Sequence, residues 1–149
     1  DPGVWFFSLD AAATLAVLIA RARWHLPYFR ASMRLEVEGD RVDYESRRLF
    51  PGPKPAEFAT RYRIGESIGN AQPGTLEHFL TERYCLYTIS EGEVYCGDIH
   101  HPPWPLQDAI ANVTKNSMAT AVGITLPPAA PLLHFAKRLE ILIWPLERV

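Results

Sequence analysis

Cysteine, methionine and excess charge are all scarce in this chain of 149 residues. It has two cysteines and two methionines, and its 15 basic and 17 acidic side chains give a formal net charge of −2 at pH 7. Two cysteines are too few for the disulfide framework of a small secreted scaffold. A nearly neutral chain offers no overall attraction to nucleic acid or to an anionic membrane surface, so we expect neither as a partner.

A long hydrophobic run is also missing. The longest mostly apolar stretch, Val4 to Ala20, is interrupted by Ser8 and Asp10 and follows no basic cluster. It is too short and too polar for a membrane span, and it lacks the shape of a secretory signal. The chain begins with Asp1-Pro2-Gly3, directly before a strand-like segment. We therefore expect its N-terminal strands to be missing.

What is present is the composition of an ordinary globular domain. Hydrophobic residues make up 48% of the chain and charged residues 21%, which is far from the composition of disordered proteins. A domain of this size buries about 70% of the surface that its unfolded chain exposes, so it needs no metal or disulfide to fold. We predict a single domain, residues 1–149, without a cofactor.

One early helix is predicted by the spacing of apolar residues. Ala11 to His25 reads as helical, with Asp10 as its N-cap and Pro27 ending it. Its predicted buried face consists of residues at i, i+3, i+4 and i+7 spacing, namely Leu15, Leu18, Ile19 and Ala22.

Two β-hairpins dominate the remaining prediction. The first joins Phe29 to Glu38 and Arg41 to Leu49 through Gly39-Asp40, and the second joins Tyr84 to Ile89 and Val94 to His100 through Glu91-Gly92. In the first hairpin, this register sets Val37 opposite Val42 and Leu35 opposite Tyr44 on an apolar face.

The other segments give weaker patterns. Phe58 to Ile64 and Leu139 to Trp144 read as strands, Phe50 to Pro55 and Gly65 to Gly74 as loops, Thr75 to Thr81 and Thr114 to Val122 as short helices, and Leu132 to Lys137 as either helix or strand. Together these elements predict an α+β domain, built mainly on an antiparallel bent sheet or partial β-barrel.

The two cysteines lie on the second hairpin. Its register places Cys96 opposite Tyr87 and diagonal to Cys85. Diagonal neighbours are about 7 to 8 Å apart, beyond the usual reach of a disulfide. We therefore predict two free and mostly buried thiols, as expected in a reducing, cytoplasmic compartment.

Ionisable residues gather at the open end of the same hairpin. Its register sets Arg83 opposite His100 and Glu82 opposite His101, beside the core-like Tyr84. Buried charges must be paired or hydrogen-bonded. One interpretation is therefore a structural ion-pair cluster. The other is a ligand pocket, in which Arg83 holds a carboxylate and Glu82 or His100 moves a proton.

The histidines also raise the question of a metal site. His78, His100 and His101 accompany Glu77 and Glu82, which are residue types that bind zinc. Their spacing matches no metal motif, and adjacent histidines in a strand point to opposite faces. We predict no metal, and we interpret the histidines as hydrogen-bonded groups near the end of the sheet.

Several segments resemble the YqjF-like family of uncharacterised bacterial proteins. They are Gly3 to Ala11, Leu26 to Phe29, Gly74 to Tyr84, His100 to Leu106 and Leu139 to Pro145. The resemblance implies the fold of acetoacetate decarboxylase, a β-barrel that encloses a small-molecule cavity. In that enzyme a reactive lysine lies six residues after a glutamate. Here Glu82 and Tyr84 match the string, but Thr88 occupies the lysine position, so a Schiff base is not expected.

Two hypotheses for function remain open. The first is an enzyme acting on a small carboxylate or oxo acid, with Glu82, Arg83 and His100 as candidate catalytic residues. The second is a non-catalytic ligand-binding or protein-interaction module. The predicted ligand-binding residues are Arg83, Tyr84, Thr88, His78 and His101. The oligomeric state does not follow from the sequence.

Overall fold

The computed structural model describes residues 2–52 and 55–149. Within these residues it has eleven strands and three helices. The helices are α1 (Thr14–Trp24), α2 (Leu76–Thr81) and α3 (Met118–Ala121). Strands carry most of the regular structure, as predicted for the α+β class. Of the predicted Phe50 to Pro55 loop, residues 53–54 lie outside the described part.

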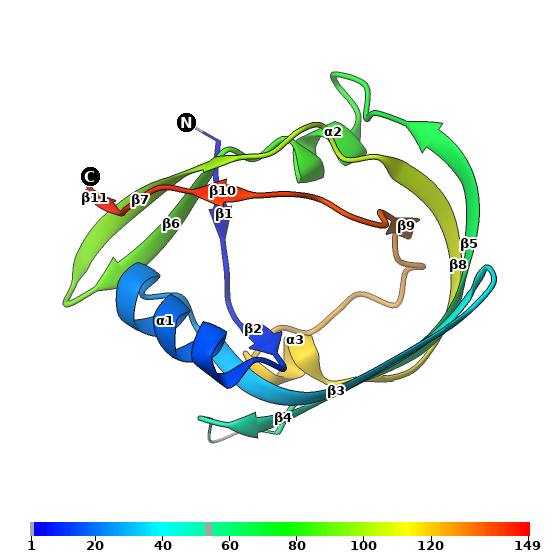
Figure 1. Cartoon of the computed structure of the whole chain (residues 1–149), viewed down its shortest axis with the longest axis horizontal. Coiled ribbons are helices and arrows are strands. Elements are labelled where there is room, and N and C mark those ends of the chain that lie inside the picture. Colours follow the sequence, from blue (N-terminus) through cyan, green and yellow to red (C-terminus); the bar gives the residue numbers. More distant parts are fainter. Residues whose placement is uncertain (1, 53–54) are drawn as a thin grey trace.

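The larger sheet curls into a half-barrel (Figure 1). In spatial order it consists of β2 (Leu9–Ala11), β3 (Tyr28–Glu38), β4 (Arg41–Phe50), β5 (Glu57–Gly69), β8 (Leu106–Asn116) and β9 (His134–Phe135). Strands β2 and β3 pair in parallel and the others are antiparallel. The sheet is therefore mixed, which differs from the predicted antiparallel arrangement.

The smaller sheet is built around the second predicted hairpin. It consists of β1 (Val4–Trp5), β6 (Cys85–Ser90), β7 (Glu93–His100) and β10 (Leu142–Ile143), and β11 (Glu147–Arg148) also pairs with β7. Strand β1 runs parallel to β6, so this sheet is mixed too. The C-terminal segment thus returns to the hairpin that lies about 50 residues earlier in the chain (Figure 1).

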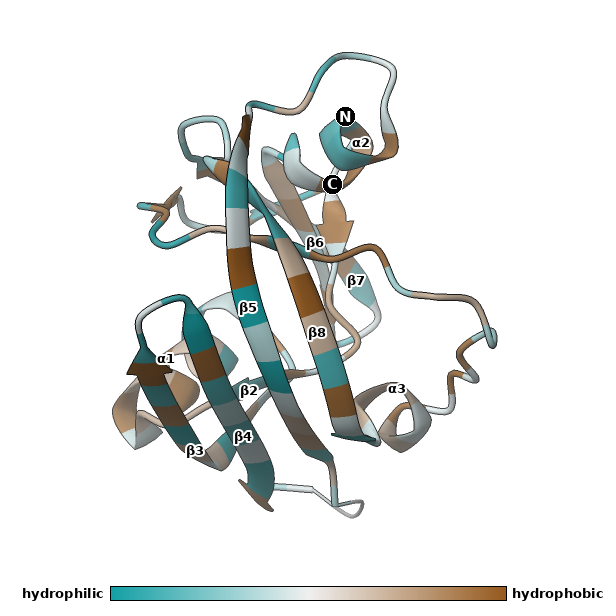
Figure 2. Cartoon of the chain, turned by 90° about the vertical axis from the view of Figure 1, so that its right-hand side faces the viewer, coloured by the Kyte–Doolittle hydropathy of each residue, from teal (hydrophilic) through white to brown (hydrophobic). Residues whose placement is uncertain are grey.

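Both hairpins form in the predicted register. Val37 pairs with Val42 and Leu35 with Tyr44, while Arg34 and Glu45 pair on the opposite face. Figure 2 shows hydrophobic and hydrophilic residues alternating along β5 and β8. This period of two gives the half-barrel one face rich in apolar side chains and one rich in charged side chains.

Helix α1 forms, but its cap and buried face differ from the prediction. It starts at Thr14 with Ala13 as N-cap and no side-chain cap, because Asp10 belongs to β2 and binds elsewhere. The buried helical residue is Val17. The predicted buried face is instead solvent-exposed, with Leu15, Leu18 and Ile19 at 70%, 54% and 45% exposure. Helical spacing identified an apolar face correctly but could not show which face the sheet covers.

Three weaker expectations also changed. Strand β5 continues through part of the predicted Gly65 to Gly74 loop, with register shifts after Ile64. The predicted Thr114 to Val122 helix is mostly wrong: residues 114–116 end β8, and only Met118–Ala121 is helical. Leu132 to Lys137 contains β9, so the open choice there resolves to strand. In both β8 and β9, pairing with a distant strand determines the conformation, and a local sequence pattern does not show such pairing.

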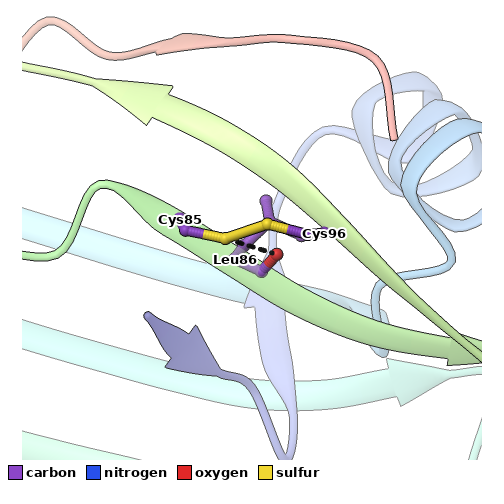
Figure 3. The surroundings of a disulfide bond; sticks show 3 residues. All are labelled: Cys85, Leu86 and Cys96. Atoms are coloured by element: carbon purple, nitrogen blue, oxygen red, sulfur yellow. Dashed lines mark hydrogen bonds between the residues drawn. A yellow bond between two sulfur atoms is a disulfide. The ribbon is translucent and has the colours of Figure 1, made fainter. Parts of the chain in front are cut away.

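The prediction of free thiols is wrong, because Cys85 and Cys96 form a disulfide (Figure 3). Cys96 does lie opposite Tyr87, so the two cysteines are diagonal neighbours as predicted. Their Cα atoms are nevertheless only 6.5 Å apart, inside the range that a disulfide spans. Strand twist brings one diagonal closer than a flat sheet would. The two cysteines therefore do not support the predicted reducing compartment.

No helix in the described part of the chain is both long enough and apolar enough to span a membrane.

Candidate functional site

A pocket of about 520 Å³ lies at the open end of the β6–β7 hairpin. Its walls are formed by Pro2, Glu82, Tyr84, Cys85, Asp98, Ile99, His100 and Trp144. We call it the strand-end pocket. Three of the predicted site residues, Glu82, Tyr84 and His100, therefore line one hollow. The volume lies within the usual range for small-molecule sites, about 300 to 1,000 Å³.

Tyr84 and Glu82 are joined directly within this pocket. The Tyr84 hydroxyl donates a hydrogen bond to the Glu82 carboxylate. This bond raises the pKa of Tyr84 above its ordinary value of 10.0, with smaller contributions from burial and from the charge of Glu82. The phenol is therefore held in its protonated, donating form, and the carboxylate has one of its acceptor positions filled.

His101 lies behind the pocket and is 5% exposed. Its ring stacks on Tyr84, with 4.8 Å between centroids and 21° between planes. Nδ1 is 2.8 Å from the Pro102 carbonyl oxygen and Nε2 is 3.2 Å from the Arg83 carbonyl oxygen. Both partners are acceptors, and a neutral imidazole carries one N–H, so His101 donates to one of these carbonyl oxygens and lies against the other. His101 supports the Tyr84 ring and does not line the pocket.

Arg83 does not line the strand-end pocket. Its guanidinium carbon lies 3.9 Å from the centre of the Phe79 ring, which is a cation–π contact. Among the described residues Arg83 forms no ion pair within 4.0 Å. The interpretation of this end of the sheet as an ion-pair cluster is therefore wrong. Instead, Arg83 contacts the Phe79 ring, and Glu82 accepts a hydrogen bond from the Tyr84 phenol.

Thr88 and His78 lie outside the pocket walls as well. Thr88 is buried, and its hydroxyl donates to the carbonyl oxygen of His25 at 2.9 Å, just past the end of α1. His78 is half-buried in α2, and its amide donates to the Thr75 hydroxyl that caps this helix. Thr88 thus links the C-terminal end of α1 to β6.

Asp98 and Trp144 are two of the five pocket residues that the sequence did not predict as site residues, and the others are Pro2, Cys85 and Ile99. Asp98 is two residues before His100 on β7, so strand alternation alone could have placed both on one face. Trp144 reaches the pocket because β10 pairs with β7 and its amide bonds to the Asp98 carbonyl. No local sequence pattern could have predicted that Trp144 lies beside β7.

Among the residues that the structure describes, the pocket walls contain two carboxylates, one imidazole and no lysine or arginine. An anion placed among Glu82 and Asp98 would be repelled, whereas hydrogen-bond donors and cations would be favoured. The ligand atoms of Cys85, Cys96 and Asp98 lie within 4.8 Å of one another, an arrangement that could hold a metal ion. Both sulfurs are bonded to each other, however, so the Asp98 carboxylate is the single ligand they leave free.

Comparison with known proteins places the chain in a family. Residues 1–140 match DUF2071, described as an uncharacterized conserved protein. The uncharacterized protein YqjF of Bacillus subtilis (strain 168) is 48% identical over 147 residues, covering 99% of this chain and 60% of the relative. The chain thus spans about 60% of the length of that curated relative. No solved structure matches. The chain belongs to the DUF2071 family of uncharacterized conserved proteins.

Proposed function

We propose that this domain binds a small molecule in the strand-end pocket. The observation that carries the proposal is the convergence of Glu82, Tyr84, Asp98 and His100 on one hollow of about 520 Å³. A pocket of ligand size with a few convergent polar groups is the usual form of a small-molecule site. Trp144 supplies an apolar wall beside these groups.

The polar lining favours a ligand that donates hydrogen bonds, such as a small amine or polyol. Two carboxylates face the pocket, and the nearest guanidinium, that of Arg83, is engaged with Phe79. A small carboxylate or oxo acid fits only if Arg83 leaves Phe79 and turns into the pocket. Acid–base chemistry on such a ligand would then fall to Glu82 or His100.

A relation to acetoacetate decarboxylase remains part of the proposal. The half-barrel supports it at the level of shape. Thr88 replaces the reactive lysine and is hydrogen-bonded to His25, and no lysine lines the pocket in the described part of the chain. We therefore propose no Schiff-base step.

Thermal-shift measurements on a ligand panel test this proposal. Small amines, polyols, carboxylic acids and keto acids are compared on the wild type and on Glu82→Gln, Arg83→Ala and Glu36→Gln. Glu36 is an exposed carboxylate on β3, paired with Arg34, and serves as the matched control. We expect amines or polyols to stabilise the wild type, the Arg83 variant and the control, but not the Glu82 variant.

Two other results have defined meanings. If keto acids stabilise the wild type but not Arg83→Ala, the ligand is a small carboxylate or oxo acid that Arg83 binds. The absence of a response to any compound in any variant would contradict small-molecule binding at this pocket.

An interaction module is the second candidate, and one observation favours it. Leu15, Leu18 and Ile19 expose an apolar face of α1 to solvent. Contiguous exposed apolar side chains are typical of protein contacts. This alternative takes a second copy of the chain as the partner. It predicts a concentration-dependent dimer in light scattering, which Leu18→Lys abolishes. A monomer at all concentrations would exclude it.

A cytoplasmic location and the absence of nucleic acid or membrane partners remain predictions. The near-neutral net charge supports the second of these. The Cys85–Cys96 disulfide argues against the first, because disulfides persist mainly in oxidising compartments.

A further inference from the structure

A second cavity lies on the apolar face of the half-barrel. It has a volume of about 490 Å³ and is bounded by β3, β4, β5, β8 and residues 133–136, the last of which include β9. It shares no wall residue with the strand-end pocket. We call it the half-barrel cavity. It is a separate site and does not depend on the function proposed above.

The walls of this cavity are mainly aromatic and aliphatic. Tyr44 and Phe58 form one tilted ring pair, with 6.1 Å between centroids, and Tyr62 and Phe135 form another at 6.0 Å. Burial raises the pKa of Tyr62, and the neighbouring Tyr44 acts in the same direction, so the Tyr62 phenol stays neutral at physiological pH. Within residues 2–52 and 55–149, no carboxylate, lysine or arginine lines this cavity. The walls suit a neutral molecule that contains a ring.

His134 is the one imidazole among the described wall residues, whose other polar side-chain groups are the hydroxyls of Thr60, Tyr44 and Tyr62. It lies on β9 opposite Asp108, and its Nε2 is 3.6 Å from a carboxylate oxygen of Glu77 at the start of α2. Within the described residues neither ring nitrogen has a hydrogen-bond partner, and both are shielded from solvent. Nε2 faces the Glu77 carboxylate, whereas Nδ1 has no such neighbour in the described part of the chain. Buried polar atoms in native proteins are nearly always hydrogen-bonded, so Nδ1 requires an explanation.

The position of Glu77 determines what His134 can offer. A carboxylate beside Nε2 favours the tautomer that carries its hydrogen on that nitrogen, which leaves a lone pair on Nδ1. An Nδ1 acceptor without a partner matches a ligand that carries a hydrogen-bond donor.

We propose that the half-barrel cavity binds a small aromatic molecule bearing one hydroxyl group, and that His134 accepts the hydrogen bond from that hydroxyl through Nδ1. Binding requires the imidazole to turn toward the cavity, since Nδ1 is otherwise shielded. The Tyr and Phe rings enclose the apolar part of the ligand. His134 then discriminates between a phenol and the corresponding hydrocarbon.

Calorimetry with matched probes tests the proposal. 4-Propylphenol is compared with propylbenzene, which lacks the hydroxyl, and with 4-propylbenzoate, which carries a charge. We expect the phenol to bind at least about tenfold more tightly than either of the others, because only the phenol both fits an apolar wall and satisfies Nδ1. Tighter binding of the benzoate would overturn the proposal, because it would require His134 to be a donor. Failure of the phenol to bind at all would overturn it as well.

A pair of variants on one strand locates the binding site. Val113 lines the cavity, whereas Ile110 on the same strand is 77% exposed and absent from the walls. Val113→Trp should fill the cavity and abolish phenol binding, while Ile110→Trp should leave it unchanged. Unaltered binding by folded Val113→Trp protein would place the phenol elsewhere and contradict the proposal.

His134→Phe tests the hydrogen bond itself. The substitution keeps a planar ring and removes both nitrogens. We expect phenol affinity to fall about tenfold, to the level of propylbenzene, while propylbenzene affinity stays the same. Because the variant removes both the unpartnered Nδ1 and the contact of Nε2 with Glu77, its Tm serves only to show that the variant is folded. An undiminished preference for the phenol would refute the role given to His134. Glu82→Gln should bind the phenol normally, which separates this result from the strand-end pocket.

Discussion

The guanidinium of Arg48 and the carboxylate of Asp10 form an ion pair that is almost completely buried. Nε and the nearer terminal nitrogen lie 2.9 and 2.8 Å from the same carboxylate oxygen, and each side chain is 4% exposed. Arg48 also donates to the Ser8 hydroxyl and lies 3.9 Å from the centre of the Phe29 ring. The pair connects β2 to β4, across the intervening strand β3. It fixes the segment that leads from the smaller sheet into the half-barrel.

Removing one member of this pair should destabilise the fold strongly. Arg48→Met leaves the Asp10 carboxylate buried and unpaired, which typically costs about 3 to 5 kcal/mol in the free energy of unfolding. Urea denaturation followed by circular dichroism measures this loss. The exposed Arg34–Glu36 pair is the control, and Arg34→Met should cost at most about 1 kcal/mol.

The double variant completes this test. Asp10→Leu combined with Arg48→Met removes both charges, so it should recover much of the stability lost by the single variant. If Arg48→Met alone stays within about 1 kcal/mol of the wild type, the pair is not the stabilising element that its burial suggests.

Sequence patterns predicted the parts of this fold that depend on neighbouring residues. The turns at Gly39-Asp40 and Glu91-Gly92 fixed both hairpin registers, because a two-residue loop leaves one pairing that keeps apolar residues on one face. The same register brought Glu82 and His100 together at one pocket. Asp10 shows the limit of local reasoning. Its position before a helix predicts a cap, but a buried arginine 38 residues away holds it in a strand.

The half-barrel cavity could not have been predicted in the same way. His134 and Glu77 are separated by 57 positions, on a two-residue strand and a six-residue helix. Neither element has a strong pattern of its own, and their contact exists because β9 pairs with the far edge of β8. Where tertiary pairing determines the conformation, a single sequence carries little signal.

Reduction of the disulfide should lower stability measurably. Cys85 and Cys96 close a loop with a sequence separation of 11. The chain-entropy relation gives about 2 to 3 kcal/mol for a loop of this size. We expect the wild type to lose this amount in the presence of a phosphine reductant, as judged by urea denaturation. Cys96→Ser should show the same loss and no response to the reductant. Thiol titration of the unfolded, unreduced wild type should detect no free thiol, and finding two would contradict the disulfide.

The acid limb of the stability curve should depend on Glu77. Its pKa lies below the ordinary value of 4.5, chiefly because its carboxylate accepts a hydrogen bond from its own backbone amide, with help from Thr75 and His134. The pKa of Asp40 is lowered from 3.8 in the same direction by Arg63. A group whose pKa is lower in the folded state stabilises the fold above the unfolded pKa. That contribution is lost as the pH falls through the folded value.

Glu77→Gln should therefore be less stable than the wild type at pH 7, and the difference should shrink as the pH falls below about 4.5. Thermal denaturation across pH 2.5 to 7, about the range in which carboxylates titrate, measures the stability difference at pH 7 and its decrease in acid. Asp40→Asn provides the second test, since its own difference should close at a lower pH. If the plots of Tm against pH for the wild type and Glu77→Gln run parallel at every pH, the Glu77 carboxylate does not contribute to the pH dependence of stability.

The smallest change with a large expected effect is Gly3→Ala. A Cβ at Gly3 would lie 2.5 Å from a ring carbon of Tyr87 and 2.7 Å from the backbone oxygen of Cys85. The ring can rotate away, but the carbonyl belongs to β6, to which β1 is paired next to this point. The added methyl must therefore push β1 away from β6, at a cost of about 1 to 3 kcal/mol.

Two measurements separate the consequences of this displacement. Hydrogen exchange should become faster in β6 at the pairs formed with Val4 and Trp5. Pro2 forms part of the strand-end pocket, so ligand stabilisation at that pocket should weaken in Gly3→Ala while phenol binding in the half-barrel cavity remains unchanged. Adding Tyr87→Ala should restore only part of the stability, because the clash with the Cys85 carbonyl remains. Full recovery in the double variant would show that the ring, and not the backbone of β6, requires glycine at this position.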